Sequence, residues 1–365
     1  MNSIIMDTLV CPSCKNSLKL TDFNNEDISQ DFQADTRQQE VLFGILKCQC
    51  ETIYPIIDGV PRFLDGGICR FPTFIEKYCK QLDKIGASSK PEHNSMETNG
   101  ADDYENIRNS FSREWGLFNY EDDKTWGWTL AERKEVFLED INMKSKELLG
   151  KFVFDAGCGN GTLTAALCDF GLRVIGMDLN DGLGLAYRNR SKFAKYLEDN
   201  VQYVQGNLLH PPIKEGVFDL VYSSGVIHHT PNSKSVFNSL VPLVKSGGRL
   251  YIWVYGKRSI PVRMFFSSGR AFKNLISLKS LVHVCNLLAP FYKVVADGLN
   301  MLGIMKFRSR TTKEITLDLF DAFAPRYNHW HTETEVRSWF QEFGFKNINV
   351  SGRQKHGFGM YGDMR

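Results

Sequence analysis

The stretch Val153-Phe-Asp-Ala-Gly-Cys-Gly-Asn-Gly-Thr-Leu-Thr164 decides the fold of this chain. It joins an apolar segment, typical of a buried strand, to the start of a helix through a glycine-rich turn, and Asp155 stands at the end of the strand. Glycine adopts positive φ angles readily and has no Cβ, so a turn with Gly157, Gly159 and Gly161 lets a ligand touch the backbone. The stretch therefore predicts a cofactor-binding turn.

The spacing of the glycines narrows the choice of cofactor. A dinucleotide-binding turn reads G-x-G-x-x-G and places a pyrophosphate on the helix N-terminus. Here the third glycine comes one position early, and Thr162 stands where it is expected. A carboxylate at Asp155 would repel a pyrophosphate but attract the ammonium of an amino acid. The turn therefore favours a cofactor that combines a nucleoside with an amino acid.

The next predicted strand carries a second acid at its end. Residues 172–178 are mostly apolar and end in Asp178, which lies 23 residues after Asp155. An acid about 20 residues after such a turn is where a ribose is held. We therefore expect Asp178 to bind both ribose hydroxyls and Leu179 to lie near the adenine.

Three later segments continue the alternation of strands and helices. Residues 201–208 predict a third strand and turn, residues 217–229 a fourth strand followed by two histidines, and residues 246–254 a Ser-Gly-Gly entry into a fifth strand. Alternating strands and helices indicate a parallel sheet that binds ligands at its carboxyl ends. Further cofactor-binding candidates in these segments are Asn207, Leu208 and Ser223.

In this order the segments resemble the motifs of the class I S-adenosylmethionine (SAM) dependent methyltransferases. The glycine-rich turn resembles motif I, and residues 217–229 resemble motif IV. The resemblance runs from about residue 149 to the end of the chain, apart from an insertion. It implies an α/β, Rossmann-like fold with seven strands, the last antiparallel, and helices on both faces, and it implies SAM as the cofactor.

Three histidines are candidates for a catalytic role. Methyl transfer depends chiefly on placing the sulfonium methyl in line with the acceptor atom, and a base helps when the acceptor is a hydroxyl. His228 and His229 follow motif IV, where many related enzymes carry a histidine that faces the reaction. His331 belongs to a loop just before a capped helix that begins near Thr332. For each histidine, a purely structural role is the alternative.

Four of the nine cysteines form two closely spaced pairs in the sequence. Cys11 and Cys14 form a C-x-x-C knuckle, and Cys48 and Cys50 form a C-x-C knuckle. Two such knuckles bring thiolates to one tetrahedral zinc. Residues 9–64 resemble the small zinc-ribbon proteins that activate some methyltransferases, whose second knuckle is usually C-x-x-C. We therefore expect a structural zinc, with a metal-free β fold as the alternative. The other five are expected to be buried core residues: Cys69, Cys79, Cys158, Cys168 and Cys285.

These observations divide the chain into three parts. Residues 1–68 are predicted to be a small zinc-ribbon β domain, residues 69–128 a linker and helical cap, and residues 129–365 the methyltransferase domain. The aromatic pair Phe111 and Trp115 in the cap resembles the F-x-x-x-W entrance of several small-molecule methyltransferases and could wall the pocket. The sequence lacks a secretory signal and a run of 18 apolar residues, so we expect a cytoplasmic protein.

A helical insertion at residues 257–320 has a large net positive charge. Residues 257–313 hold eleven lysines and arginines against the single acid Asp297, a net charge of +10, whereas the whole chain has +2. The insertion also has an apolar stripe at helical spacing: Leu278, Leu281, Val282, Cys285 and Leu288. This combination suggests peripheral contact with an anionic membrane, a pocket for an anionic amphiphile, or a phosphate-backbone site; a cap with solvated charges is the alternative.

The sequence thus predicts a methyltransferase that acts on a small-molecule or lipid- or glycan-linked metabolite. An RNA base methyltransferase is the first alternative, suggested by the ribbon and the basic insertion. No N-P-P-Y-like tetrapeptide follows motif IV, which makes nucleic acid the less favoured partner. A non-catalytic SAM-binding subunit is the second alternative, and the intact motif set from Asp155 to Gly248 argues against it.

Overall fold

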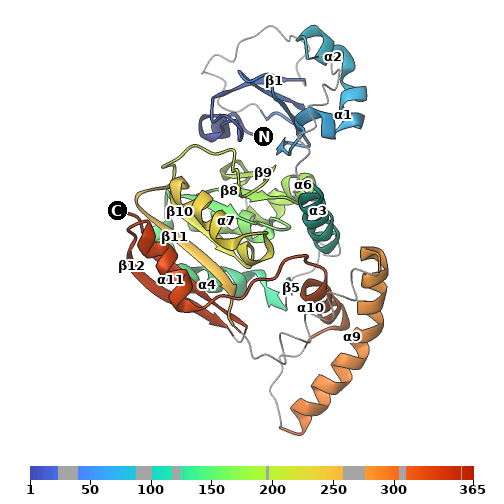
Figure 1. The fold of residues 1–365 in the computed structure, drawn as a ribbon, viewed down its shortest axis with the longest axis vertical. Helices are drawn as coiled ribbons and strands as arrows, with labels where there is room; N and C mark the ends of the chain where they lie inside the picture. The colour runs from blue at the N-terminus through green and yellow to red at the C-terminus, as the bar shows by residue number, and fades with distance from the viewer. Residues whose placement is uncertain are drawn as a thin grey trace.

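The computed structural model describes residues 1–23, 40–87, 101–116, 124–125, 127–194, 197–257, 276–303, 310–354 and 356–365. Its centre is a sheet in the strand order β9-β8-β7-β10-β11-β13-β12 (Figure 1). Strands β9 to β11 pair in parallel, and β13 is antiparallel to both neighbours. The strands are β7 (Phe152–Ala156), β8 (Arg173–Asp178), β9 (Val201–Gly206), β10 (Phe218–Ser224), β11 (Val244–Tyr255), β12 (Lys346–Gln354) and β13 (Gly357–Asp363). The expected Rossmann-like sheet with an antiparallel last strand is confirmed.

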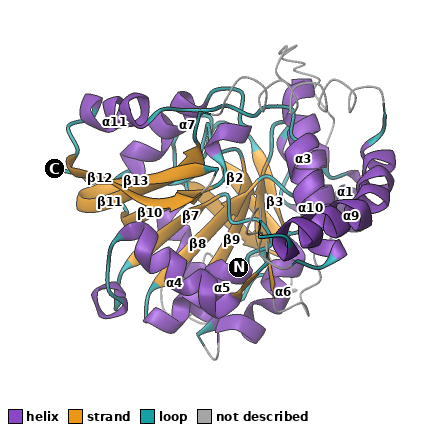
Figure 2. Cartoon of the chain, turned by 90° about the horizontal axis from the view of Figure 1, so that it is seen from below, coloured by secondary structure: helices purple, strands orange, loops and turns teal. Residues whose placement is uncertain are grey.

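Helices cover both faces of this sheet (Figure 2). Helices α7 (Ser233–Leu240) and α11 (Glu333–Glu342) lie on one face, and α4 (Leu130–Ile141), α5 (Thr162–Ala166) and α6 (Leu183–Ala194) lie on the other. Helix α11 begins with the predicted capping box, in which Thr332 and Glu335 bond each other's backbone. Its residues Val336, Trp339 and Phe340 are buried against the sheet, as their helical spacing predicts.

The N-terminal strands β1 to β4, called the ribbon from here on, continue the same sheet. These strands are β1 (Leu18–Asp22), β2 (Gly44–Cys48), β3 (Ile53–Ile57) and β4 (Val60–Phe63). They pair antiparallel with one another, and β4 pairs in parallel with β9, so that one sheet of 11 strands results. The sequence predicts a separate small β domain; instead, β4 covers the backbone groups that β9 would otherwise expose at an edge. The ribbon residues Leu46, Tyr54 and Phe63 also share one apolar core with the catalytic sheet.

Smaller elements complete the N-terminal part. Helices α1 (Pro72–Lys77) and α2 (Cys79–Lys84) pack on the ribbon, and α3 (Ala101–Trp115) lies beside the catalytic sheet (Figure 2). Strands β5 (Lys124–Thr125) and β6 (Trp128–Thr129) form a small hairpin. Short 3₁₀ turns lie at Ser3–Thr8, Gly67–Arg70, Ser145–Leu148, Leu167–Phe170, Glu198–Asn200, Ile227–His229 and Val241–Leu243. The expectation that all unpaired cysteines are buried is wrong for Cys69 and Cys79, which are exposed around the start of these helices, and right for the other three.

The insertion contains α9 (Leu278–Met301) and α10 (Thr312–Phe323), which pack together. Leu281, Val282 and Cys285 of the predicted stripe are buried against α10. Leu288 is exposed, contrary to the prediction, because α10 is half as long as α9 and covers only part of it. Residues 258–275 and 304–309, with six of the basic side chains, lie outside the described residues, as does most of the linker, residues 88–100.

The joint between ribbon and catalytic sheet predicts a stability difference between two arginines. Arg62 of β4 is 5% exposed, and its guanidinium donates to Gln205 Oε1 of β9 at 3.1 Å. We expect Arg62→Ala to lower the free energy of unfolding by about 2–4 kcal/mol, because it leaves a cavity and a buried amide oxygen without its donor.

Arg188→Ala is the matched control. Arg188 pairs with Asp58 beside the same joint, but its side chain is 55% exposed, so the loss should stay below about 1 kcal/mol. Urea unfolding of both variants measures the difference. Equal losses would mean that the joint does not stabilise the fold.

Candidate active site

The glycine turn after β7 adopts the conformation that its residues predict. Gly157, Gly159 and Gly161 have φ angles of +90°, +58° and +73°, which side chains rarely adopt. The carbonyl of Gly161 accepts a hydrogen bond from the buried hydroxyl of Tyr203 at 2.7 Å. A Cβ on Gly159 would lie 2.4 Å from the indole of Trp115, so α3 closes directly over the turn. The backbone is therefore held in place by neighbouring strands and covered by α3.

Asp155 lies at the carboxyl end of β7, next to this turn. Its side chain is buried, and Oδ2 accepts a hydrogen bond from the Thr164 hydroxyl at 2.6 Å. Burial raises the pKa of Asp155 to about 6, while the Thr164 bond and the nearby Arg133 guanidinium oppose the rise. Arg133 is itself fixed by a 2.9 Å bond to Thr162. At neutral pH the site thus holds a carboxylate at low exposure, which suits a cationic ligand group.

Asp178 ends the adjacent strand β8 and faces the same turn. Its two oxygens accept backbone N–H bonds from Gly159 at 2.8 Å and from Asn180 at 3.0 Å. The Asn180 side chain returns a bond to the Gly159 carbonyl at 3.0 Å. Burial raises the pKa of Asp178. A carboxylate accepts hydrogen bonds only, so a group at this position suits ligand hydroxyls, which can donate to it.

The loop after Asp178 is fixed from the ribbon side. The buried amide of Gln205 donates to the Leu179 carbonyl at 3.0 Å and to Asp181 at 2.9 Å, and it accepts from Arg62. Arg108 of α3 also pairs with Asp181 at 2.9 Å. Gln205 and Arg62 were not predicted from the sequence. Each is a polar residue within a mostly apolar strand, which indicates a buried hydrogen bond.

The remaining cofactor candidates line the ends of β9 and β10. The side chain of Asn207 accepts the Leu209 N–H at 2.9 Å, and Leu208 is buried beside it. Ser223 is fully buried, and its hydroxyl donates to the Ala156 carbonyl at 2.9 Å. Its hydroxyl hydrogen is therefore used to tie β10 to β7, and cofactor binding by these three residues stays a prediction.

His228 and His229 lie in the short turn after β10. The ring of His228 is fully buried, 4.2 Å from the His229 ring and 4.1 Å from that of Tyr255. Neither nitrogen of His228 has a hydrogen-bond partner among the described residues, and burial lowers its pKa well below the usual value. His229 Nδ1 lies 3.1 Å from the Tyr327 carbonyl, and its ring contacts Phe111 edge-on at 5.8 Å. His228 is thus a neutral imidazole with unused hydrogen-bonding capacity inside an aromatic cluster.

Unlike His228, His331 has both ring nitrogens within hydrogen-bond distance of other side chains. Its Nδ1 lies 2.9 Å from Glu335 Oε1 and its Nε2 lies 3.0 Å from Ser233 Oγ. Both ring nitrogens are therefore engaged by protein groups. Burial lowers the pKa of His331, although Glu335 opposes this. A hollow of about 370 Å³ beside it is lined by Lys257, Asn328, His329, Trp330, His331 and Glu335. This arrangement favours a role in positioning the loop; a catalytic role stays a prediction.

Two further acids lie near the glycine turn and the histidines. Glu114 of α3 is 1% exposed, and its Oε2 has no hydrogen-bond partner among the described residues. Burial and the nearby charges of Asp321 and Asp178 raise the pKa of Glu114 well above its usual value. Asp321 of α10 accepts a bond from the Tyr255 hydroxyl at 3.1 Å. Sequence reasoning did not select Glu114, although an acid within an aromatic segment was a signal. Acids collected in this way fit a cationic ligand.

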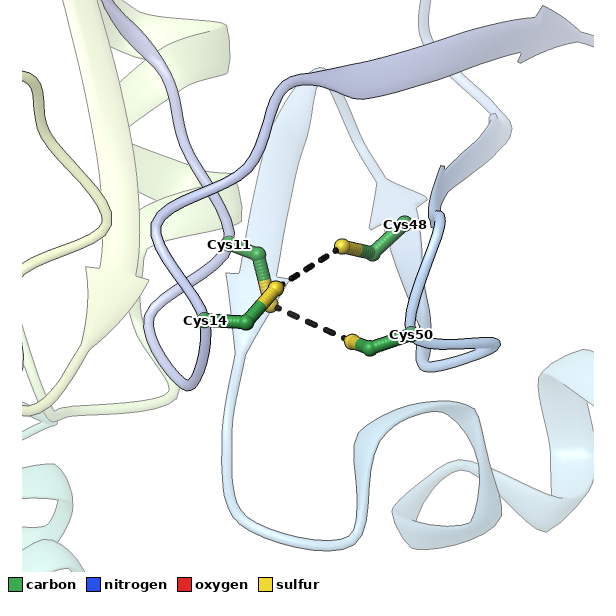
Figure 3. Close-up of side chains that lie close together, drawn as sticks. All are labelled: Cys11, Cys14, Cys48 and Cys50. Carbon is green, nitrogen blue, oxygen red and sulfur yellow. Dashed lines mark hydrogen bonds between the residues drawn. The ribbon is translucent and has the colours of Figure 1, made fainter.

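The four knuckle cysteines come together in the ribbon, as Figure 3 shows. The Sγ atoms of Cys11 and Cys50 are 3.7 Å apart, those of Cys14 and Cys48 are 3.3 Å apart, and all four lie within 4.8 Å of one another. All four are free thiols. A tetrahedral zinc with sulfurs at about 2.3 Å would need sulfur–sulfur distances of about 3.8 Å. The shorter C-x-C knuckle therefore still delivers both of its thiols to a metal-sized site.

Comparisons with known proteins match the centre of the chain. Residues 154–252 fit the family model described as a methyltransferase domain. Methyltransferase GfsG of Streptomyces halstedii is 25% identical over 215 residues, covering 59% of this chain and 77% of that protein. The ubiquinone biosynthesis O-methyltransferase of Aeromonas salmonicida is 30% identical over 124 residues, covering 34% of this chain and 51% of that one.

One further curated relative and one solved structure are also methyltransferases by name. The sterol 24-C-methyltransferase of Schizosaccharomyces pombe is 25% identical over 164 residues, covering 42% of this chain and 43% of its own length. The chain thus spans about half or less of two of these three curated relatives. Among solved structures, the magnesium protoporphyrin IX methyltransferase from Synechocystis PCC 6803 with bound SAM superposes with a TM-score of 0.43 at 15% identity, covering 73% of this chain and 100% of that one.

Proposed function

We propose that this chain, whose residues 154–252 match a methyltransferase domain, transfers the methyl group of SAM to a small-molecule or lipid- or glycan-linked acceptor. One observation carries the proposal. Asp155 and Asp178 end adjacent parallel strands and flank a single glycine turn, one fixed by the Thr164 hydroxyl and the other by the Gly159 N–H. The first carboxylate suits the ammonium of the cofactor, and the second suits its ribose hydroxyls.

The described residues fit SAM in their chemistry. SAM, when bound, supplies a methyl group on a positively charged sulfur. Glu114 and Asp321 would stabilise positive charge near the glycine turn, and the unpartnered Oε2 of Glu114 gives a buried acceptor for a ligand. Trp115 and Phe111 would exclude water above the turn and beside His229, respectively.

His228 is the residue best placed to accept a proton from the acceptor. Its neutral imidazole has no hydrogen-bond partner among the described residues, and Tyr255 and His229 hold the ring by contact at about 4 Å. A neutral imidazole would take the proton that an acceptor hydroxyl loses as its oxygen bonds to the methyl carbon and the bond from that carbon to the sulfur breaks. If the acceptor is a carbon or an amine, the same ring would serve to position it.

The choice of acceptor class follows from the relatives and the site. The names of the relatives refer to sterol and ubiquinone biosynthesis, and the comparisons give no support for RNA methylation. The aromatic cluster around His228 also suits an apolar or planar acceptor. The neutral His228 in the same region as Asp155 and Asp178 supports an enzyme over a non-catalytic SAM-binding subunit.

Cofactor binding is tested by Asp178→Ala. We expect the affinity for SAM to fall by at least about 100-fold, because two hydrogen bonds to a charged acceptor are lost. Asp169→Ala is the control, since Asp169 pairs with Lys134 away from the glycine turn. Calorimetric titration of SAM into each folded variant gives the affinities. Equal affinity for the Asp178 variant and the native protein would contradict the assignment of this carboxylate.

Methyl transfer is tested with SAM that carries a radioactive methyl group. We expect label from the native protein to enter the small-molecule or organic-soluble fraction of a cell extract, and we expect none from Asp178→Ala. Label in the RNA fraction instead would support the first alternative. Tight SAM binding without label in any fraction would support a non-catalytic subunit.

We also infer that the four knuckle cysteines hold one zinc ion that stabilises the ribbon. Hydrogen bonds from Thr52 lower the pKa of Cys50, whereas burial raises the pKa of Cys48, so metal binding would have to displace the Cys48 proton. The site has no open coordination position if all four thiolates bind, which is typical of structural zinc. Because the ribbon shares a core with the catalytic sheet, metal loss would affect the whole fold.

Metal analysis of the purified protein should give about one zinc per chain. We expect Cys14→Ser to lose the metal and to lower the unfolding temperature, since three ligands close the site poorly. Cys79→Ser replaces an exposed cysteine outside the cluster and should change neither quantity. Native protein that is fully folded and metal-free after zinc-replete purification would leave a metal-independent ribbon.

A further inference from the structure

Helix α9 exposes a row of large apolar side chains. Leu287, Phe291 and Val294 are 79%, 71% and 71% exposed, and their spacing of four and three residues places them on one face. The neighbouring exposed apolar residues of the same region are Leu288, Tyr292, Val295, Met301 and Leu302. We call this set the apolar face of α9. A contiguous apolar surface of this kind marks a site that another surface covers.

The opposite side of α9 is already used for packing. Leu281, Cys285 and Ala289 are buried, and the first two contact α10. The middle of α9, from Cys285 to Val294, therefore has a buried apolar side and an exposed apolar side, which is unusual for a helix in water. Figure 1 shows α9 extending past α10 at the margin of the molecule, away from the sheet. The apolar face thus remains accessible to a large partner.

The charge of the insertion identifies the kind of partner. Five of its eleven basic residues precede α9 in the sequence and four follow it. On α9 itself, Lys293 is paired with Asp297 at 2.8 Å. A second copy of the chain would bring two regions of charge +10 together. The phosphates of a nucleic acid would neutralise the positive charge but leave the apolar face in water. An anionic lipid surface would both neutralise the positive charge and bury the apolar face.

We propose that α9 lies in the plane of an anionic membrane, with Leu287, Phe291 and Val294 inserted among the lipids, and that the net positive charge of the insertion sequence favours the anionic surface. In the part of the chain that is described, no helix is both long enough and apolar enough to cross a bilayer. Amphipathic helices that lie on a membrane combine an apolar face with lysine and arginine beside it.

The position of α9 connects this surface to the candidate active site. Helix α10 packs on α9 and carries Asp321, which accepts the hydrogen bond from Tyr255 next to His228. A membrane-bound α9 would therefore hold the acceptor site close to the bilayer. Membrane binding itself does not depend on the proposed methyl transfer, and it can be measured without SAM.

Co-sedimentation with lipid vesicles tests the proposal. We expect the whole protein to sediment with vesicles of phosphatidylcholine and phosphatidylglycerol but hardly with phosphatidylcholine alone. Raising the salt from about 0.1 M should weaken binding, because the screening length falls below about 10 Å. The triple variant Leu287→Ser, Phe291→Ser, Val294→Ser should reduce partitioning by about tenfold, since the inserted side chains are removed.

Two further variants separate the contribution of the apolar face from that of the positive charge. Leu149→Ser changes a residue that is 75% exposed on the methyltransferase domain and should leave partitioning unchanged. Reversing the charge of Arg263, Arg270 and Lys273 to glutamate should abolish the preference for anionic vesicles. Thermal unfolding of each variant checks that its fold is retained.

Other outcomes would overturn the proposal. Failure of the native protein to bind anionic vesicles at low salt excludes membrane docking. Dimerisation in analytical ultracentrifugation that the triple serine variant abolishes would make the apolar face an interface between two copies. Tight RNA binding with a steep salt dependence, unaffected by the serine changes, would make the insertion a nucleic-acid site.

Discussion

The parallel pairing of β4 with β9 is the constraint on which the rest of the structure depends. Through it, a ribbon that could be an independent module becomes the edge of the catalytic sheet. The buried guanidinium of Arg62 reaches across this joint to Gln205, and Gln205 in turn holds the backbone of Leu179 beside Asp178. The integrity of the ribbon and the geometry of the loop after β8 are therefore physically linked, and the proposed zinc would influence the proposed cofactor site through these contacts.

Electrostatics dominate the candidate active site. Asp155, Asp178, Glu114 and Asp321 collect near the glycine turn, and burial raises the pKa of each. Like charges at low exposure are costly without a counter-charge. A cofactor with a sulfonium and an ammonium would supply that counter-charge, so this group of acids would favour a cationic ligand. The neutral His228 adds no positive charge that would oppose it.

The sequence predicted those features that depend on residues close together in the chain. The glycine turn, the two acids that end β7 and β8, and the capping box of α11 are set by local φ angles, strand ends and hydrogen bonds. The cysteine cluster was predictable because only the two knuckles had to meet. The joining of β4 to β9 was not, since a short strand gives no signal of its partner. Glu114 and Gln205 were missed because burial of a polar side chain is decided by tertiary packing.

The place of the insertion in the fold explains why it should bear on the acceptor. It leaves the sheet after β11 and returns before α11, at the carboxyl edge where parallel sheets bind their ligands. Loops at this edge differ in length and composition among proteins of one fold, whereas the strands beneath them hold the cofactor. In this chain the edge carries Tyr255 at the end of β11, Asp321 on α10, and the apolar face of α9. Asp321 on α10 and the apolar face of the adjoining α9 would together suit an acceptor with a reactive head and an apolar tail.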